Sequence, residues 1–112
     1  MDQPQQGHDW SAYNAAKSAV LQIARSMACE LGPSKIRVNT VSPGHIYTKM
    51  TAAVLDVNPE LGRKWADSNP LGRLGAVHEL RGVVAWLASD ASTFCTGYAS
   101  LISTTLTQEL IF

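Results

Sequence analysis

The sequence has 112 residues, of which 46% are hydrophobic and 16% charged, and nine basic residues balance nine acidic ones to a formal net charge of zero. This composition predicts one small globular domain, and the lack of a charged run argues against a nucleic acid or an anionic membrane as partner. The first ten residues are polar, and no later run is long enough to span a bilayer. We therefore expect a cytoplasmic protein without a signal peptide.

A long helix is expected over Ser11–Leu31, because Ser11 is a suitable N-cap and Gly32-Pro33 provides a stop. Apolar residues recur at helical spacing between these limits: Ala16, Ala19, Val20, Ile23, Met27 and Leu31. A short strand is expected over Ile36–Val41, where side chains alternate in a β-branched run that ends at the turn Ser42-Pro43-Gly44.

The middle of the chain is expected to form a covering segment, with two short helices at Met50–Asp56 and Glu60–Asp67 separated by Pro59. A second strong helix is expected over Val77–Ser89, with one apolar stripe made of Leu80, Val83, Val84 and Leu87.

A last strand is expected over Tyr98–Leu106, from its Thr, Leu and Ile content. Because a crossover helix precedes it, we predict that it pairs in parallel beside the Ile36–Val41 strand. Trp86 and Phe94 are expected in the core. Two strands cannot by themselves cover the apolar faces of two such helices, so the pattern indicates part of a larger doubly wound α/β domain.

The two cysteines, Cys29 in a helical pattern and Cys95 in a loop, are too sparse for a disulfide framework. Neither has metal-ligand spacing to His8, His45 or His78, so no metal site is expected. We interpret both thiols as reduced and structural.

Tyr13 and Lys17 are four residues apart on the first predicted helix, so their side chains share one face. A free phenol titrates near about 10, and an ammonium a few Å away favours the phenolate, lowering such a pKa by roughly 1 to 3. This pair suits proton transfer to or from an alcohol or carbonyl oxygen. A Tyr and a Lys four residues apart also occur by chance on helix surfaces, so this spacing alone does not establish a site.

Four separated motifs extend this pair. Tyr13-Asn14-Ala15-Ala16-Lys17 is followed by Ile36-Arg37-Val38-Asn39-Thr40-Val41-Ser42-Pro43-Gly44, by Leu71-Gly72-Arg73-Leu74-Gly75 and by Leu87-Ala88-Ser89-Asp90-Ala91-Ser92 with Thr96-Gly97. In this order and spacing, they resemble the C-terminal half of the short-chain dehydrogenase/reductase family over about residues 11–97. The resemblance implies an α/β fold, the C-terminal part of a Rossmann-like doubly wound parallel sheet whose N-terminal half is missing.

By this resemblance, Tyr13 would be the general acid in carbonyl reduction and the base in alcohol oxidation. Lys17 would favour its phenolate and hold the nicotinamide ribose hydroxyls of NADP or NAD, between which the sequence does not choose. Pro43 and Gly44 match a turn beside the nicotinamide, although a plain turn after a strand explains them equally. The expected cofactor-binding residues are Tyr13, Lys17, Pro43, Gly44, Ile46, through its backbone, and Thr48, through its hydroxyl.

Other residues near these motifs carry a structural interpretation. His45 and Tyr47 are expected as loop residues without a catalytic role. Trp65 and Asn69 fall where relatives place a lid over the substrate, yet an amphipathic helix anchored by Trp65 explains that residue equally well. Arg73 is expected to pair with a nearby carboxylate.

The sequence also departs from the family. It contains no T-G-x-x-x-G-x-G turn for the pyrophosphate, no central Asn-Ala-Gly segment, and no serine at the family's catalytic distance before Tyr13, since Ser11 is too close. After Thr96-Gly97 relatives continue through an Asp and a Gly-Gly pair, whereas residues 98–112 diverge, as a shifted reading frame or altered splice would produce. We therefore divide the chain into a polar lead-in (1–10), a family-like part (11–97) and a divergent tail (98–112).

The leading hypothesis is an NAD(P)-dependent oxidoreductase that is inactive as these 112 residues alone, in a family that forms homo-oligomers. Its substrate would be an alcohol or ketone, and Pro4-Gln5-Gln6 with Tyr13-Asn14 resembles the fungal enzymes acting on polyols and ketoses. One alternative is a truncated pseudo-enzyme that associates with a full-length relative, and another is a mis-predicted gene product without a stable fold. In the first alternative, association would use an apolar stripe made of Ala16, Val20, Ile23 and Met27.

Overall fold

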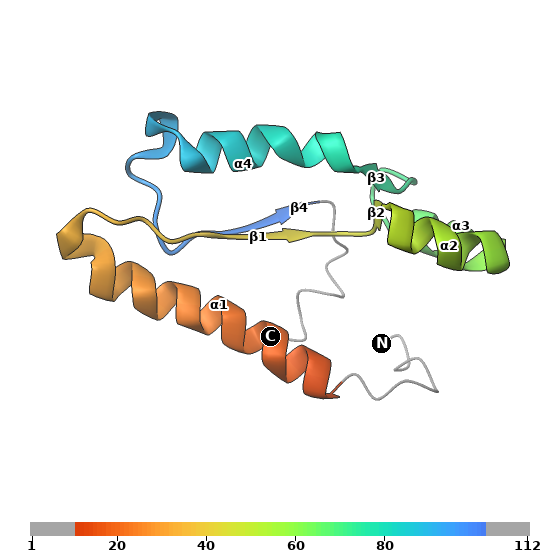
Figure 1. The fold of residues 1–112 in the computed structure, drawn as a ribbon, viewed down its shortest axis with the longest axis horizontal. Coiled ribbons are helices and arrows are strands. Elements are labelled where there is room, and N and C mark those ends of the chain that lie inside the picture. Colours follow the sequence, from red (N-terminus) through yellow and green to blue (C-terminus); the bar gives the residue numbers. More distant parts are fainter. Residues whose placement is uncertain (1–10, 103–112) are drawn as a thin grey trace.

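In a computed structural model, which describes residues 11–102, helices flank a pair of parallel strands (Figure 1). The helices are α1 (Ser11–Leu31), α2 (Lys49–Val57), α3 (Pro59–Asp67) and α4 (Arg81–Ala88). Short 3₁₀ turns are η1 (Gly32–Ser34), η2 (Val77–Leu80) and η3 (Asp90–Ser92), and the strands are β1 (Thr40–Pro43), β2 (Ile46–Tyr47), β3 (Gly75–Ala76) and β4 (Ala99–Ile102).

The helix α1 confirms the predicted span Ser11–Leu31 without a break. Its buried side is narrow and consists of Ala24 and Ala28, which are 8% and 6% exposed. Near its end, a Cβ built on Gly97 would lie 3.5 Å from the Ala28 Cβ, so small residues allow α1 to approach the segment that leads into β4.

The strands β1 and β4 pair in parallel, with Thr40 opposite Ala99 and Pro43 opposite Ile102. This pairing confirms the predicted parallel neighbours, and α1 and α4 lie on opposite sides of the two strands, as in a doubly wound sheet (Figure 1). Residues 103–106 of the predicted last strand lie outside the described residues.

The predicted limits of the first strand were wrong, because β1 begins four residues later than expected, at Thr40. Before that point, side chains replace part of the backbone ladder. Val38 N donates to Thr96 Oγ1 at 3.1 Å, and the Asn39 side chain donates to Cys95 O at 3.0 Å while accepting from Tyr98 N at 3.0 Å. Polar side chains next to a backbone compete for such ladder bonds.

A guanidinium ties this same segment to α4. Arg37 donates to the carbonyl oxygens of Leu87 at 2.6 Å, Ser89 at 3.3 Å and Cys95 at 3.1 Å. The first two carbonyls belong to the end of α4, where helix carbonyls lack intrahelical partners. Arg37 therefore satisfies that helix end and fixes α4 relative to β1.

Both predicted short helices are confirmed, because caps define their starts. At α2, Thr48 Oγ1 accepts from Thr51 N at 3.2 Å and Thr51 Oγ1 accepts from Thr48 N at 2.7 Å, which is a capping box. At α3, Asn58 Oδ1 accepts from Leu61 N, and Pro59 occupies the first helical turn.

The predicted helix over Val77–Ser89 is divided into a 3₁₀ turn and α4. Its first turn carries Glu79, whose carboxylate accepts from Ala76 N at 2.7 Å, and 3₁₀ turns are frequent where helices begin. Of the predicted stripe, Leu80, Val83 and Leu87 are half-buried, whereas Val84 is 51% exposed.

The core assignment of Trp86 and Phe94 was wrong, since these side chains are 43% and 104% exposed. Within residues 11–102, the sheet of β1 and β4 has two strands, and both rings remain exposed beside it. Among residues 11–102, both cysteines are free, and Cys29 is exposed on α1. No helix within that range is long and apolar enough to cross a membrane.

Candidate functional site at the carboxyl ends of the strands

The side chains of Tyr13 and Lys17 lie together on the first turns of α1. Lys17 Nζ is 5.6 Å from the centre of the Tyr13 ring, and Tyr13 is 54% exposed. The predicted shared face is therefore confirmed, and both side chains are accessible to a ligand.

The orientation of α1 places this pair at one particular end of the sheet. The helix runs opposite to β1, so its first turns lie toward the carboxyl ends of β1 and β4 (Figure 1). In open parallel sheets, ligands bind outside the carboxyl ends of the strands.

The loop Pro43–Thr48 leaves β1 at that same end and contains the four other residues predicted to contact a cofactor. Pro43 is the last residue of β1, and Gly44 N donates to Ile102 O at 2.8 Å, which joins the ends of both strands. Ile46 pairs with Gly75 in the second small sheet, and its carbonyl accepts from Thr51 Oγ1 at 3.1 Å.

Thr48 has a structural role in this structure, because its hydroxyl accepts from Thr51 N in the capping box. A hydroxyl has two acceptor lone pairs as well as its donor, so the cap leaves Thr48 with hydrogen-bonding capacity. The loop is thus fixed at both ends, by β4 at Gly44 and by α2 at Thr48.

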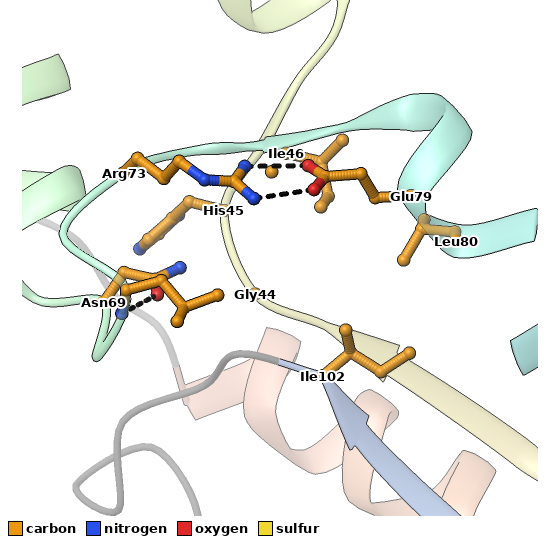
Figure 2. A pocket seen from close by; sticks show the side chains of 10 residues that line it. Gly44, His45, Ile46, Asn69, Arg73, Glu79, Leu80 and Ile102 are labelled. Atoms are coloured by element: carbon orange, nitrogen blue, oxygen red, sulfur yellow. Dashed lines mark hydrogen bonds and ion pairs between the residues drawn. The ribbon is translucent and has the colours of Figure 1, made fainter. Parts of the chain in front are cut away.

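A small cavity of about 70 Å³ lies beside this loop (Figure 2). This volume is well below the roughly 300 Å³ typical of small-molecule sites, so the cavity accommodates one end of a substrate at most. It is lined by Gly44, His45, Ile46, Asn69, Leu71, Arg73, Gly75, Glu79, Leu80 and Ile102.

His45 and Trp65 stack against each other beside this cavity, with ring centroids 4.6 Å apart and ring planes within 3° of parallel. Burial lowers the pKa of His45 below its usual 6.5, because charging the ring would require desolvating a cation. His45 lies at a bend, as predicted, whereas Tyr47 lies in β2 rather than in a loop.

Arg73 and Glu79 form the ion pair that the sequence predicts for Arg73. Two nitrogens of the guanidinium donate to the two carboxylate oxygens at 2.8 and 2.6 Å (Figure 2). The Arg73 hydrogen bond, followed by that from Ala76 N, lowers the pKa of Glu79 to about 2. The pair is exposed, so it positions the turn before η2 more than it adds stability.

Asn69 is 7% exposed and closes the turn after α3. Its Oδ1 accepts from Leu71 N at 2.9 Å, while its backbone carbonyl accepts from Gly72 N at 2.8 Å. Within residues 11–102, no group of three His, Cys, Asp or Glu side chains could hold a metal ion.

Comparison with known proteins decides the family. Residues 3–104 match the family described as enoyl-(acyl carrier protein) reductase. Sorbose reductase sou1 of Schizosaccharomyces pombe is 46% identical over 94 residues, which cover 84% of this chain and 34% of that protein. The chain belongs to the short-chain dehydrogenase/reductase family.

Another relative in this family, the ribulose-forming D-arabinitol 2-dehydrogenase of Candida tropicalis, is 41% identical over 87 residues, covering 77% of this chain and 31% of that protein. The crystal structure of 3-oxoacyl-[acyl-carrier protein] reductase from Brucella melitensis matches with a TM-score of 0.75 at 39% identity, covering 82% of this chain and 33% of that one. The chain thus spans about a third of the length of its relatives.

These matches confirm the resemblance predicted from the four motifs and the assignment to a partial Rossmann-like α/β fold. The short-chain dehydrogenase/reductase motifs did not predict the stack of His45 on Trp65. The available signals were a histidine directly after Pro43-Gly44 and an aromatic anchor on an amphipathic helix, and neither signal names the other residue as its partner.

Proposed function

We propose that this chain provides the proton-transfer side of an NAD(P)-dependent oxidoreductase that interconverts an alcohol and a carbonyl. The observation that carries the proposal is the pair Tyr13 and Lys17, exposed on one helix face at the carboxyl ends of two parallel strands. Proton exchange with a substrate oxygen needs such an acid or base within reach of solvent and substrate.

The residues present fit the nicotinamide end of a dinucleotide. An ammonium with three donors at Lys17 and a phenol at Tyr13 suit the hydroxyls of a ribose. The loop Pro43–Thr48 follows the carboxyl end of a strand, where its backbone and the Thr48 hydroxyl would meet the nicotinamide. The choice between NAD and NADP stays open.

In carbonyl reduction, the Tyr13 phenol donates its proton to the substrate oxygen, and in alcohol oxidation its phenolate takes that proton back. Lys17 would hold the ribose hydroxyls through its ammonium donors. When bound, the dinucleotide would supply or accept the hydride.

We propose a polyol or ketose as substrate. The support is the naming of two relatives, a sorbose reductase and a D-arabinitol 2-dehydrogenase, which are 46% and 41% identical to this chain. A cytoplasmic location stays a prediction from composition.

A second candidate function is association with a full-length relative or with a second copy. The exposed stripe on α1 favours it, since Val20, Ile23 and Met27 are 52%, 56% and 40% exposed. Apolar side chains clustered on one helix face are typical of interfaces. A homo-oligomer would use the same α1 stripe as its interface.

The proposed activity is tested in a joined protein, in which the N-terminal part of the S. pombe sorbose reductase precedes residues 11–112 of this chain. We expect it to reduce sorbose with NADPH or NADH, and Lys17→Met to weaken cofactor binding and turnover together. If the joined protein is folded and binds cofactor yet never turns over, the oxidoreductase proposal fails. In that case, the association function would be favoured if this chain binds the intact relative and Val20→Glu abolishes that binding.

A further inference from the structure

The stack of His45 on Trp65 joins two parts of the molecule that are separated in the chain. His45 belongs to the loop Pro43–Thr48, whereas Trp65 lies in the last turn of α3. The contact therefore bridges α3 directly to the loop that the proposed function assigns to the nicotinamide.

A second route joins the same segments through α2. Thr51 at the start of α2 donates to Ile46 O at 3.1 Å, and a Cβ built on Gly62 of α3 would lie 3.2 Å from Leu55 Cδ2 of α2. This route fixes α2 on the loop and continues to α3 through the packing of one helix on the other. The stack adds a direct contact between α3 and the loop.

The imidazole makes this contact through its face. Within residues 11–102, the His45 ring nitrogens make no hydrogen bond to protein, although His45 O accepts from Gly75 N at 3.0 Å. With planes 3° from parallel and centroids 4.6 Å apart, the rings have the offset arrangement that aromatic pairs prefer.

We propose that His45 is a positioning residue whose flat ring, stacked on Trp65, holds the end of α3 beside the nicotinamide loop and so fixes Asn69 and Leu71, which follow α3 and line the cavity beside that loop. This inference rests on the proposed function, because the loop takes its role from it. The stacked ring faces hold α3 in place, and the ring nitrogens do not contribute to this.

Three variants separate shape from polarity. His45→Phe keeps a flat ring, His45→Gln keeps neutral hydrogen-bonding groups without the ring, and His45→Ala keeps neither. On the 112-residue chain, amide hydrogen exchange of α3 should accelerate about 2- to 10-fold in the Gln and Ala variants, the range an aromatic pair supplies, and the Phe variant should restore slow exchange. His78→Ala, at an exposed histidine on η2, is the matched control and should change nothing.

A double variant checks that the partner is Trp65. Trp65→Leu should accelerate exchange as His45→Ala does, and combining the two should add nothing, because both remove the same contact. Additive effects would overturn the stack as the cause.

In the joined protein, the same loss should appear as an approximately 2- to 10-fold higher KM for the polyol or ketose, with kcat and the KM for the dinucleotide nearly unchanged. A merely structural role would move all three parameters together. Rescue of the substrate KM by His45→Phe is expected, and rescue by His45→Gln with failure of His45→Phe would show that the nitrogens bind substrate and overturn the proposal. If the joined protein is folded and binds cofactor yet never turns over, the proposed function fails, while the exchange result still decides the stack.

Discussion

On α1, a single helix places Tyr13 and Lys17, whereas the loop Pro43–Thr48 is placed by partners from several other elements. The α1 pair needs only the four-residue spacing that brings side chains together on a helix. The loop is held by Ile102 at the end of β4, by Gly75, by Thr51 and by Trp65. A change in the loop region should therefore alter geometry and stability, while a change in the pair should alter catalysis and cofactor binding with little effect on stability.

The largest effect is expected from Tyr13→Phe in the joined protein. Loss of the proton donor should reduce kcat by about 10²- to 10⁴-fold, the range of general acid–base catalysis, whereas cofactor affinity should fall much less, because Lys17 still holds the ribose hydroxyls. Steady-state kinetics and a dinucleotide titration measure the two quantities. Tyr98→Phe, at a tyrosine 49% exposed before β4, is the control and should retain activity. A Tyr13→Phe protein with undiminished turnover would remove Tyr13 from the mechanism.

The next largest effect is expected from Arg37→Met, which removes the donors to Leu87 O, Ser89 O and Cys95 O. Hydrogen bonds to a charged donor contribute about 2 kcal/mol, so the free energy of unfolding should fall by about that amount. Urea unfolding of the 112-residue chain measures it. Arg25→Met on the exposed side of α1 is the matched control. Equal losses of unfolding free energy in both variants would contradict the role of Arg37 in holding α4 on β1.

A smaller effect is expected from Thr51→Val, which keeps the shape but removes the hydroxyl that accepts from Thr48 N and donates to Ile46 O. Loss of a helix cap costs about 1 kcal/mol, and the free energy of unfolding should fall by that much. Thr51→Ser should retain most of it. If Thr51→Ser is as unstable as Thr51→Val, the hydroxyl is not what holds α2 on the loop.

The smallest effect concerns acid stability through Glu79. The folded-state pKa of about 2 lies below the ordinary value of 4.5, so the contribution is complete above about pH 4.5 and is lost as pH falls toward 2. Glu79→Gln should flatten the dependence of Tm on pH in this window, measured by circular dichroism. Because the pair is exposed, the change should shrink in high salt, and Glu30→Gln should leave the slope intact.

The sequence was sufficient to predict those elements whose boundaries are set by residues close by in the chain. The stop at Gly32-Pro33 directly follows α1, and Pro59 lies at the boundary between the two predicted short helices. For the same reason, the four-residue spacing alone was enough to predict that Tyr13 and Lys17 share one helix face.

Where long-range contacts dominate, prediction failed or was silent. The start of β1 depends on Asn39 and Thr96, whose partners lie 56 to 59 residues away in the sequence. The exposure of Phe94 depends on what the sheet offers as a partner surface, which a hydrophobic pattern does not encode. The pairing of His45 with Trp65 arises from the path of the chain through α2 and α3.

The central claim, that this chain carries the proton-transfer and nicotinamide-side contacts of a short-chain dehydrogenase/reductase, is tested most directly by titrating two proteins with NADPH and NADH while following nicotinamide fluorescence. The 112-residue chain alone should show no saturation, because its sequence has no Gly-rich pyrophosphate turn and few contacts would have to offset roughly 4 to 15 kcal/mol of lost ligand freedom. The joined protein should saturate and reduce sorbose. Saturation of the chain alone at micromolar dinucleotide, or a joined protein that binds cofactor without turning over, would contradict the account.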